Sequence, residues 1–304
     1  MSEPVDRPEI SVTATEAGRA DKELARHYPE AGRRQLAELF DEGCVRVRGK
    51  RAKKGDRVEI GDLIGLTRAP VTGEDYRPLP DPAAGEQLVV LLERPEVIVV
   101  AKPAGMPTQP LRAGELGTVA NGIAHRWPEC AAIGDDPRDG GLVHRLDIGT
   151  SGALIAARSL EAYRELREAF GTGRVDKIYL AIVDGRPVAR ESDAPLVQRG
   201  KKVAVDQTDG LAAHTAFSVD RASATHALVR CHARTGRMHQ VRAHLAHVGS
   251  PISGDTLYGG VPITGFDGFF LHAATLTFPL GTTQVKLEAP PPDRFLHALA
   301  AVGL

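Results

Sequence analysis

Residues 144–152 read HRLDIGTSG and form the densest cluster of polar side chains in the chain. A short apolar segment, GGLVH, leads into this stretch, and a second one, ALIAA, follows it. Both segments favour strands, so Asp147 is expected on a tight loop between two rigid elements, where a functional side chain can be held firmly. The competing interpretation is an Asx turn, in which the Asp147 side chain accepts hydrogen bonds from amides of its own loop.

Around this loop, residues 86–304 contain many short apolar or β-branched runs bounded by turn-forming or charged residues. We expect strands over residues 89–92, 97–100, 142–143, 153–157, 178–183, 227–231 and 285–287. Helical spacing of apolar side chains occurs over residues 160–170 and 238–248. Many strands with few helices predict an α+β domain built around an antiparallel or mixed sheet.

The predicted helix over 238–248 carries several polar side chains that can do chemistry. A buried apolar stripe would begin at Met238 and end at Val248. His239 and Arg242 lie three positions apart, so they share one side of the helix, and a guanidinium turned inward there requires a carboxylate partner. The three histidines of the segment have no acidic ligand beside them and lack the H-E-x-x-H spacing, so we expect no metal site.

The N-terminal part of the chain predicts a separate small unit. Residues 17–68 contain two helical patterns, one around Leu24 and one through Leu36 and Phe40, followed by a basic hairpin. The hairpin segment, residues 46–57, carries seven basic side chains against one acidic side chain. Such a run indicates either a solvated charged loop or a surface for nucleic acid, and it offsets the overall net charge of −1, which argues weakly against a nucleic-acid partner.

These patterns divide the chain into four segments. We expect a disordered leader over 1–16, the small α+β unit over 17–68, a linker rich in Pro, Gly and acidic residues over 69–85, and a large domain over 86–304.

Composition and motif spacing exclude several classes of protein. The chain has no run of eighteen apolar residues, so no transmembrane helix is expected, and its three scattered cysteines indicate reduced thiols in a cytosolic protein. It has no glycine-rich phosphate loop, so a nucleotide cofactor is not expected. Residues 149–153 fail the G-x-S-x-G spacing of a serine nucleophile at the last position. An aspartic-protease loop needs Thr or Ser directly after the aspartate, where Ile148 stands, and a second matching loop.

Several motifs in residues 86–304 together resemble the RluA-type family of pseudouridine synthases. The segment 144–152 matches its H-R-L-D-x-x-T-S-G loop, 177–185 its K-x-Y-x-A-x-V-x-G element, and 236–245 its G-R-x-H-Q-(I/V)-R-x-H-L element. Residues 254–259 match G-D-x-x-Y-G, and shorter family turns match at 102–105 and 271–273. The chain departs from the family at Met238, where Thr is usual, and at Ser250, where His is usual.

The N-terminal part resembles a small RNA-binding domain named after a ribosomal small-subunit protein, the S-four-like fold. The resemblance covers residues 19–66. Arg48 stands where that family often has Asn before its Gly, and Ala20 stands where Leu is usual.

The two resemblances imply an enzyme that isomerises uridine to pseudouridine in structured RNA, without metal or cofactor. They imply Asp147 as the essential carboxylate, as nucleophile or base, Arg242 as its partner, and Tyr179 as the residue that stacks on uracil. Arg145 is expected to displace the base or hold a phosphate, its alternative role being a structural ion pair. The expected RNA contacts are Arg145, Arg46, Arg48, Lys50, Arg51, Lys53, Lys54 and Arg237.

The resemblance favours large-subunit ribosomal RNA as substrate, with transfer RNA as the alternative. We also expect a cytoplasmic monomer without membrane contact. Two other functions stay open at this point. One is a non-catalytic RNA-binding or ribosome-assembly factor, which would not need the set of Asp147, Tyr179 and Arg242. The other is a hydrolase that uses Ser151.

Overall fold

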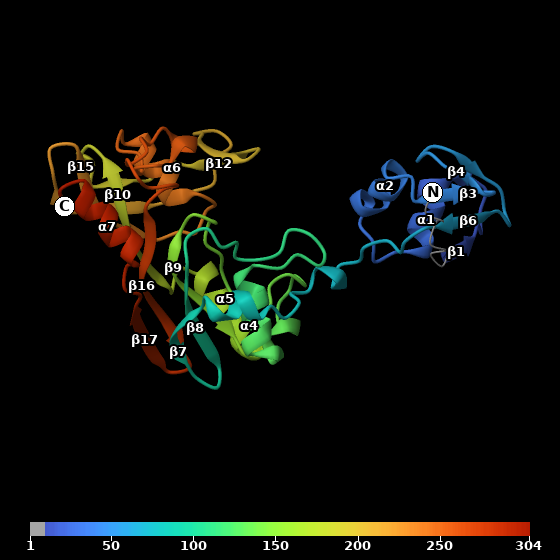
Figure 1. Cartoon of the computed structure of the whole chain (residues 1–304), viewed down its shortest axis with the longest axis horizontal. Helices are drawn as coiled ribbons and strands as arrows, with labels where there is room; N and C mark the ends of the chain where they lie inside the picture. Colours follow the sequence, from blue (N-terminus) through green and yellow to red (C-terminus); the bar gives the residue numbers. More distant parts are fainter. Residues whose placement is uncertain (1–9) are drawn as a thin grey trace. The chain divides into compact units, whose positions relative to one another are not determined.

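The computed structural model describes residues 10–304, which form two compact units (Figure 1). The first unit extends to Arg77 and takes in Arg112–Gly114, and the second comprises Pro78–Leu111 and Glu115–Leu304. The second unit therefore begins inside the segment 69–85 that we expected to be a linker. Of the leader expected over 1–16, residues 1–9 lie outside the described residues, whereas Ile10–Thr13 form a strand (β1) rather than a disordered segment.

The first unit packs two helices against small antiparallel sheets. Its elements in chain order are β1, β2 (Gly18–Arg19), α1 (Ala20–His27), α2 (Arg33–Asp41), β3 (Val45–Val47), β4 (Lys50–Arg51), β5 (Arg57–Val58) and β6 (Leu63–Leu66). The strands are ordered β1-β6-β3-β4, and β2 pairs with β5. Leu24, Leu36 and Phe40 are buried against Val45 and Ile64, so the predicted order of two helices and a basic hairpin is confirmed.

The turn between β3 and β4 gives Arg48 a left-handed backbone conformation. Val47 pairs with Lys50, so Arg48 and Gly49 form a two-residue hairpin loop. Both have positive φ, 51° at Arg48 and 76° at Gly49, as a type I′ turn requires. Asn adopts this conformation more readily than Arg, and the Arg48 side chain is held there by two hydrogen bonds to Asp62, of 2.7 and 2.6 Å.

The second unit is built on one large mixed sheet, as the sequence predicted. Its strands are ordered β11-β14-β15-β10-β16-β9-β8-β7, with β17 paired to β16. Every pair is antiparallel except β9 with β16, which is parallel. The bounds are β7 (Val89–Glu93), β8 (Val97–Lys102), β9 (Ser151–Ala157), β10 (Asp176–Asp184), β11 (Glu191–Ser192), β14 (Thr215–Ala222), β15 (His226–Ala233), β16 (Leu271–Leu280) and β17 (Thr283–Glu288). A separate hairpin pairs β12 (Leu196–Arg199) with β13 (Lys202–Val205).

Helices cover both faces of this sheet, so its central strands are apolar on both sides. Along β8, Ile98 and Val100 pack in one core cluster and Val97 and Val99 in another, on the opposite face. The covering helices are α3 (Pro82–Glu86) and α4 (Val119–Arg126) on one face and α5 (Leu160–Gly171) on the other, with α6 (Gln240–His247) and α7 (Asp293–Ala301) over the β10–β15 half. Short 3-10 turns are η1 (Glu74–Tyr76) in the first unit and η2 (Pro128–Ala132) and η3 (Thr256–Tyr258) in the second.

Two local predictions were wrong. Residues 142–143 make no strand, because only Leu142 forms an isolated bridge, to Ala156. The helix expected from 238 begins at Gln240, since His239 has a left-handed backbone with φ of 52° that a right-handed helix cannot include. Met238 therefore does not continue a buried stripe, and 39% of its surface is exposed.

Within residues 10–304, no helix is both long enough and apolar enough to cross a membrane.

Candidate active site

The loop that carries Asp147 is clamped from one side by the turn that follows β8. Thr108 Oγ1 donates to the carbonyl of Leu146 at 2.7 Å and accepts from the Leu146 amide at 3.2 Å. The amine of Lys102 donates to three carbonyls, among them that of Ile148 at 2.9 Å, which also accepts from the Gly105 amide. Neighbouring contacts on both sides of Asp147 therefore fix the backbone that presents its side chain.

Lys102 makes this clamp with a buried amine. Burial lowers the pKa of its amine to about 7, while the charge of Asp147 opposes the shift. A neutral amine has only two N–H groups, so its three carbonyl partners also favour the ammonium form.

On its other side the loop runs into the parallel junction of the sheet. Gly152 pairs with Ala273 of β16, and Ala273 pairs in turn with Tyr179 of β10. Gly152 has φ of 117°, and a Cβ added there would lie 2.3 Å from the carbonyl oxygen of Ala273. Only glycine permits this approach, which brings the end of the Asp147 loop within two strands of Tyr179.

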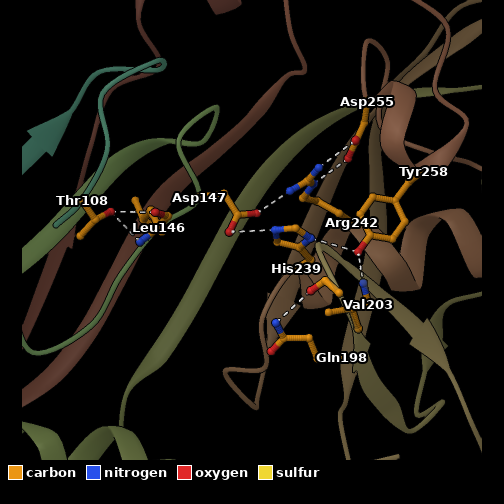
Figure 2. A network of polar contacts seen from close by, with 10 residues as sticks. Thr108, Leu146, Asp147, Gln198, Val203, His239, Arg242, Asp255 and Tyr258 are labelled. Atoms are coloured by element: carbon orange, nitrogen blue, oxygen red, sulfur yellow. Dashed lines mark hydrogen bonds and ion pairs between the residues drawn. The ribbon is translucent and has the colours of Figure 1, made fainter. Parts of the chain in front are cut away.

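Arg242, on α6, joins Asp147 to a second carboxylate (Figure 2). Its Nη1 donates to Asp147 Oδ2 at 2.9 Å. Arg242 is therefore paired with Asp147, as the family resemblance implied. Its Nε and Nη2 donate to Asp255 at 2.7 and 2.9 Å, and its guanidinium carbon lies 4.4 Å from the ring centre of Phe269. The side chain of Asp255 is 1% exposed and that of Asp147 is 24% exposed, so Asp255 is the structural partner and Asp147 faces the solvent-accessible side.

The other oxygen of Asp147 faces His239. His239 Nε2 lies 3.7 Å from Asp147 Oδ1, and its Nδ1 lies 3.0 Å from the hydroxyl of Tyr258 (Figure 2). That hydroxyl accepts from the Val203 amide at 2.9 Å. Burial lowers the pKa of His239 below its ordinary value, with Asp147 opposing the shift and Arg242 adding to it, so the neutral ring is favoured.

Two further residues of the 236–245 segment have structural roles. Gln240 is buried, its carbonyl oxygen accepts from Thr235 and from the Arg237 amide, and its amide nitrogen donates to Thr215. His244 is also buried, with Nδ1 2.9 Å from Thr215 Oγ1 and Nε2 2.9 Å from the carbonyl of Ala194. These contacts seat α6 against β14 and thereby fix the direction of Arg242 and His239.

Around these groups lies a cavity of about 180 Å³. It is lined by Asp147, Thr150, Tyr179, Met238, His239 and Arg242, with Arg145 and Arg237 also in its wall. Tyr179 is partly buried, and burial, together with the charge of Asp147, raises the pKa of its hydroxyl, so the hydroxyl is protonated at neutral pH. Within the described part of the chain, the hydroxyl makes no hydrogen bond and is available to a ligand in this cavity.

The structure thus brings together the three residues expected to be catalytic, and it places Arg145 and Arg237 in the wall of the same cavity. Arg145 is exposed, and among residues 10–304 it forms no ion pair. Arg237 is exposed and donates to the carbonyl of Ala212 at 3.1 Å. The six expected contacts on the hairpin, Arg46, Arg48, Lys50, Arg51, Lys53 and Lys54, are all exposed on the first unit.

Two alternative interpretations do not fit the geometry. The Asp147 carboxylate contacts Arg242 and His239 instead of loop amides, and the turn is closed by the backbone bond from the Thr150 amide to the Asp147 carbonyl, so it is not an Asx turn. Ser151 is 4% exposed and lies 2.9 Å from Nδ1 of His272, whose Nε2 contacts the Ala289 carbonyl. This pair lies in the core beneath the parallel junction, where a substrate cannot reach it.

Two residues that contact the site were assigned no role from the sequence. Asp255 and Tyr258 belong to the G-D-x-x-Y-G segment, which we quoted for its resemblance but to which we assigned no role. The feature of the sequence that could have pointed to them is a pair of polar residues, Asp255 and Tyr258, within a turn bounded by two glycines. No group of three or more His, Cys, Asp or Glu side chains with metal-binding geometry occurs among the residues that the structure describes.

Residues 96–247, which contain the Asp147 loop, Tyr179 and Arg242, match the family described as RNA pseudouridylate synthase. The chain belongs to this family. A protein named ribosomal large subunit pseudouridine synthase D, from Xanthomonas campestris, is 33% identical over 99% of this chain and 95% of its own length. An uncharacterized RNA pseudouridine synthase of Mycobacterium bovis is 34% identical over 92% of this chain and 93% of its own.

A solved structure agrees with the architecture. The human RNA pseudouridylate synthase domain containing 4 superimposes with a TM-score of 0.58 at 23% identity, covering 70% of this chain and 92% of that one. The α+β fold with a mixed sheet is therefore confirmed, and as a family member the chain is an RNA pseudouridine synthase, which is an isomerase.

Proposed function

We propose that this enzyme converts specific uridines of large-subunit ribosomal RNA to pseudouridine, with Asp147 as its catalytic carboxylate. The observation that carries the proposal is the ion pair of Asp147 with Arg242 in the wall of a cavity that Tyr179 also lines. The choice of RNA rests on the Xanthomonas relative, whose name specifies the large ribosomal subunit.

The reaction rearranges one nucleotide without adding or removing atoms. The bond from N1 of uracil to ribose C1′ breaks, C5 of the base bonds to C1′, and the proton lost from C5 is balanced by one gained at N1. The target base must first leave its stack, at a cost of roughly a few kcal/mol, and enter the cavity. Asp147 acts there as nucleophile at C1′ or as base, with Oδ2 bound by Arg242 and with no hydrogen bond to Oδ1 from any residue of 10–304.

Tyr179 and Arg242 support the carboxylate in different ways. Arg242 pairs with the Asp147 carboxylate and orients it, because a carboxylate in a partly closed cavity needs a nearby cation. Tyr179 stacks on the uracil ring and brings its hydroxyl close to the position from which the C5 proton leaves. A hydroxyl that lines the cavity and has no partner among the described residues is suited to this contact.

RNA binding would use both units. The first unit acts as an S-four-like RNA-binding domain whose hairpin, with Arg46, Arg48, Lys50, Arg51, Lys53 and Lys54, contacts phosphates. In the second unit, Arg145 and Arg237 at the rim of the cavity hold or displace the target nucleotide. The tip of the β12–β13 hairpin adds Arg199, Lys201 and Lys202.

The deciding experiment compares Asp147→Asn with Asp209→Asn, an exposed aspartate outside the cavity, as a matched control. Pseudouridine formation in total cellular RNA should be abolished by the first substitution and unaffected by the second, with the same thermal unfolding for both. Full activity of Asp147→Asn would overturn the assignment of the carboxylate.

Comparing pseudouridine maps of a deletion strain and its parent would identify the substrate. Loss at large-subunit ribosomal uridines supports the proposal, and loss only in transfer RNA selects the alternative substrate with the same chemistry. Unchanged maps together with retained RNA binding would favour the non-catalytic assembly factor.

A further inference from the structure

His239 has no assigned part in the proposed reaction. It lines the cavity beside Asp147, and its side chain is 14% exposed. It also adopts a left-handed backbone with φ of 52°, one of two non-glycine residues to do so in the part of the chain that the structure describes. A strained backbone at a residue whose side chain lies beside a reacting group points to a specific task.

The contacts of Tyr258 determine which nitrogen of His239 carries the proton. A phenol has one hydrogen, and the oxygen of Tyr258 already accepts from the Val203 amide at 2.9 Å. When the hydroxyl donates to His239 Nδ1, 3.0 Å away, the neutral ring carries its hydrogen on Nε2, directed at Asp147 Oδ1. In the opposite arrangement, the Nε2 lone pair would face the carboxylate, and the hydroxyl hydrogen would have no acceptor among the described residues.

The same tyrosine also restrains the other partner of the carboxylate. Its ring lies edge-on to the His239 ring, with centres 5.8 Å apart, and its centre is 5.0 Å from the guanidinium carbon of Arg242. Val203 belongs to β13, so the chain of contacts begins at the β12–β13 hairpin and ends at Asp147 (Figure 2). Each oxygen of Asp147 thus faces one nitrogen that a separate structural contact has oriented.

We propose that His239 is a positioning residue for Asp147: its neutral Nε2–H, fixed by Tyr258 and Val203, holds Oδ1 in the reactive direction. The inference rests on the proposed role of Asp147. At 3.7 Å the contact is open in the RNA-free enzyme, and it closes when a nucleotide fills the cavity. A neutral donor orients the carboxylate without cancelling the charge that the reaction uses.

This arrangement predicts a dependence on pH. The charged groups that face His239 are Asp147 and Asp255, which favour its protonation, and Arg242 and Arg145, which oppose it. Protonation would place a hydrogen on Nδ1, break the bond from Tyr258, and set a second cation against Asp147. The rate should therefore fall on the acid side as His239 becomes protonated, below the ordinary histidine pKa of 6.5.

The first test removes only the hydroxyl, by Tyr258→Phe, which keeps the ring against Arg242. Single-turnover rates are read as tritium released from an unmodified large-subunit ribosomal RNA transcript labelled at uridine C5, between about pH 5.5 and about pH 8.5. We expect a rate about 10-fold lower, with RNA affinity within about twofold, and an acid limb moved to higher pH, because Nδ1 becomes free to accept a proton. An acid limb unchanged in Tyr258→Phe would overturn the inference.

The second test uses His239→Gln and His239→Leu, which impose the same backbone strain but differ in the donor. Glutamine offers an N–H that cannot titrate, so the rate of His239→Gln should stay within about threefold of the parent rate and should no longer fall in acid. Leucine offers no N–H, so His239→Leu should lower the rate about 10- to 100-fold. His247→Leu, at an exposed histidine on α6, is the control for folding and should change neither the rate nor its dependence on pH. Equal rates for the glutamine and leucine variants would refute the positioning role.

The outcomes separate this inference from the proposed function. A wild-type enzyme that releases no tritium, or an Asp147→Asn variant that releases it, refutes the function itself. An active wild type and a silent Asp147→Asn, together with an unimpaired His239→Leu, refute the inference alone.

Discussion

Asp255 holds the guanidinium of Arg242 by two hydrogen bonds, to Nε at 2.7 Å and to Nη2 at 2.9 Å. This leaves Nη1 directed at Asp147, 95 residues away in the chain. One buried cation therefore serves two carboxylates of unequal exposure. Asp255 offsets most of the cost of burying Arg242, so Asp147 can remain at the cavity wall.

Asp255→Asn should impair both stability and catalysis. The neutral amide removes one of the two negative charges that balance Arg242, and we expect a loss of about 2–3 kcal/mol in the free energy of unfolding. Arg242 would then bind Asp147 more tightly, and the single-turnover rate should fall about 10-fold or more. Urea unfolding and tritium release measure the two effects, with Asp209→Asn as the control. Normal values for both would contradict the division of roles between the carboxylates.

Gly152→Ala should destabilise the second unit severely. Its φ of 117° and the Ala273 carbonyl, 2.3 Å from an added Cβ, leave no space for a side chain, so we expect a loss of about 3 kcal/mol or more. Gly171→Ala, at the end of α5 with open space around it, should lie within about 1 kcal/mol of the parent. The single tryptophan, Trp127, is buried in the second unit, and its fluorescence during urea unfolding reports both changes. Equal stability of the two variants would contradict this account.

The first unit should lose stability in acid because of Glu23. Burial alone would raise the pKa of this carboxyl, but hydrogen bonds from Thr15 and Arg26 lower it to about 2, from 4.5. The stabilisation is complete above pH 4.5 and is lost as the pH falls towards 2, since only the unfolded chain takes up the proton in that range.

Pulsed hydrogen exchange of peptides from residues 10–66, labelled at one fixed pH after equilibration in urea, measures this effect on the full chain. The urea midpoint should fall with pH in the parent and should depend much less on pH in Glu23→Gln. An identical pH dependence in both proteins would rule out Glu23 as the cause.

Removing Lys50, Lys53 and Lys54 together should weaken RNA binding in a salt-dependent way. If each contacts a phosphate, substitution by alanine lowers the slope of log affinity against log salt by roughly 2 to 3, at about 0.7–0.9 for each contact. Filter binding to a large-subunit ribosomal RNA transcript at several salt concentrations measures the slope. Lys286→Ala, on β17 of the second unit, serves as the control. An unchanged slope for the triple variant would mean that this hairpin does not bind the RNA backbone.

Much of the site could be predicted because its residues stand in spaced motifs. Asp147, Tyr179 and Arg242 come from three separate segments, and they were expected in one site only because the family resemblance joins them. The contribution of Asp255 could not be predicted, since nothing in the spacing of 254–259 shows that its carboxylate faces α6. The tautomer of His239 depends on Val203, which lies in a hairpin that the sequence did not predict.

The fold was predictable where apolar patterns were strong. The run 97–100 and the spacing of 160–170 gave β8 and α5 nearly at their bounds. The strand predicted over residues 142–143 is absent because Leu142 forms only an isolated bridge and Val143 is a loop residue. Both are buried in the core, and burial alone does not make a strand. Helix α6 starts later than predicted because a left-handed residue at His239 overrides its apolar spacing.

The parallel pairing of β9 with β16 has a consequence for how the enzyme is made. Ser151 and His272, which bond across that pairing, are 121 residues apart, and Arg242 and Asp255 also follow Asp147 in the chain. A ribosome emits the N-terminal residues first, at about 5–20 residues per second, so the nascent chain presents an exposed Asp147 loop for several seconds before its partners emerge. The cavity that Asp147 lines can therefore be completed only after Arg242, Asp255 and the strand that contains His272 have been made.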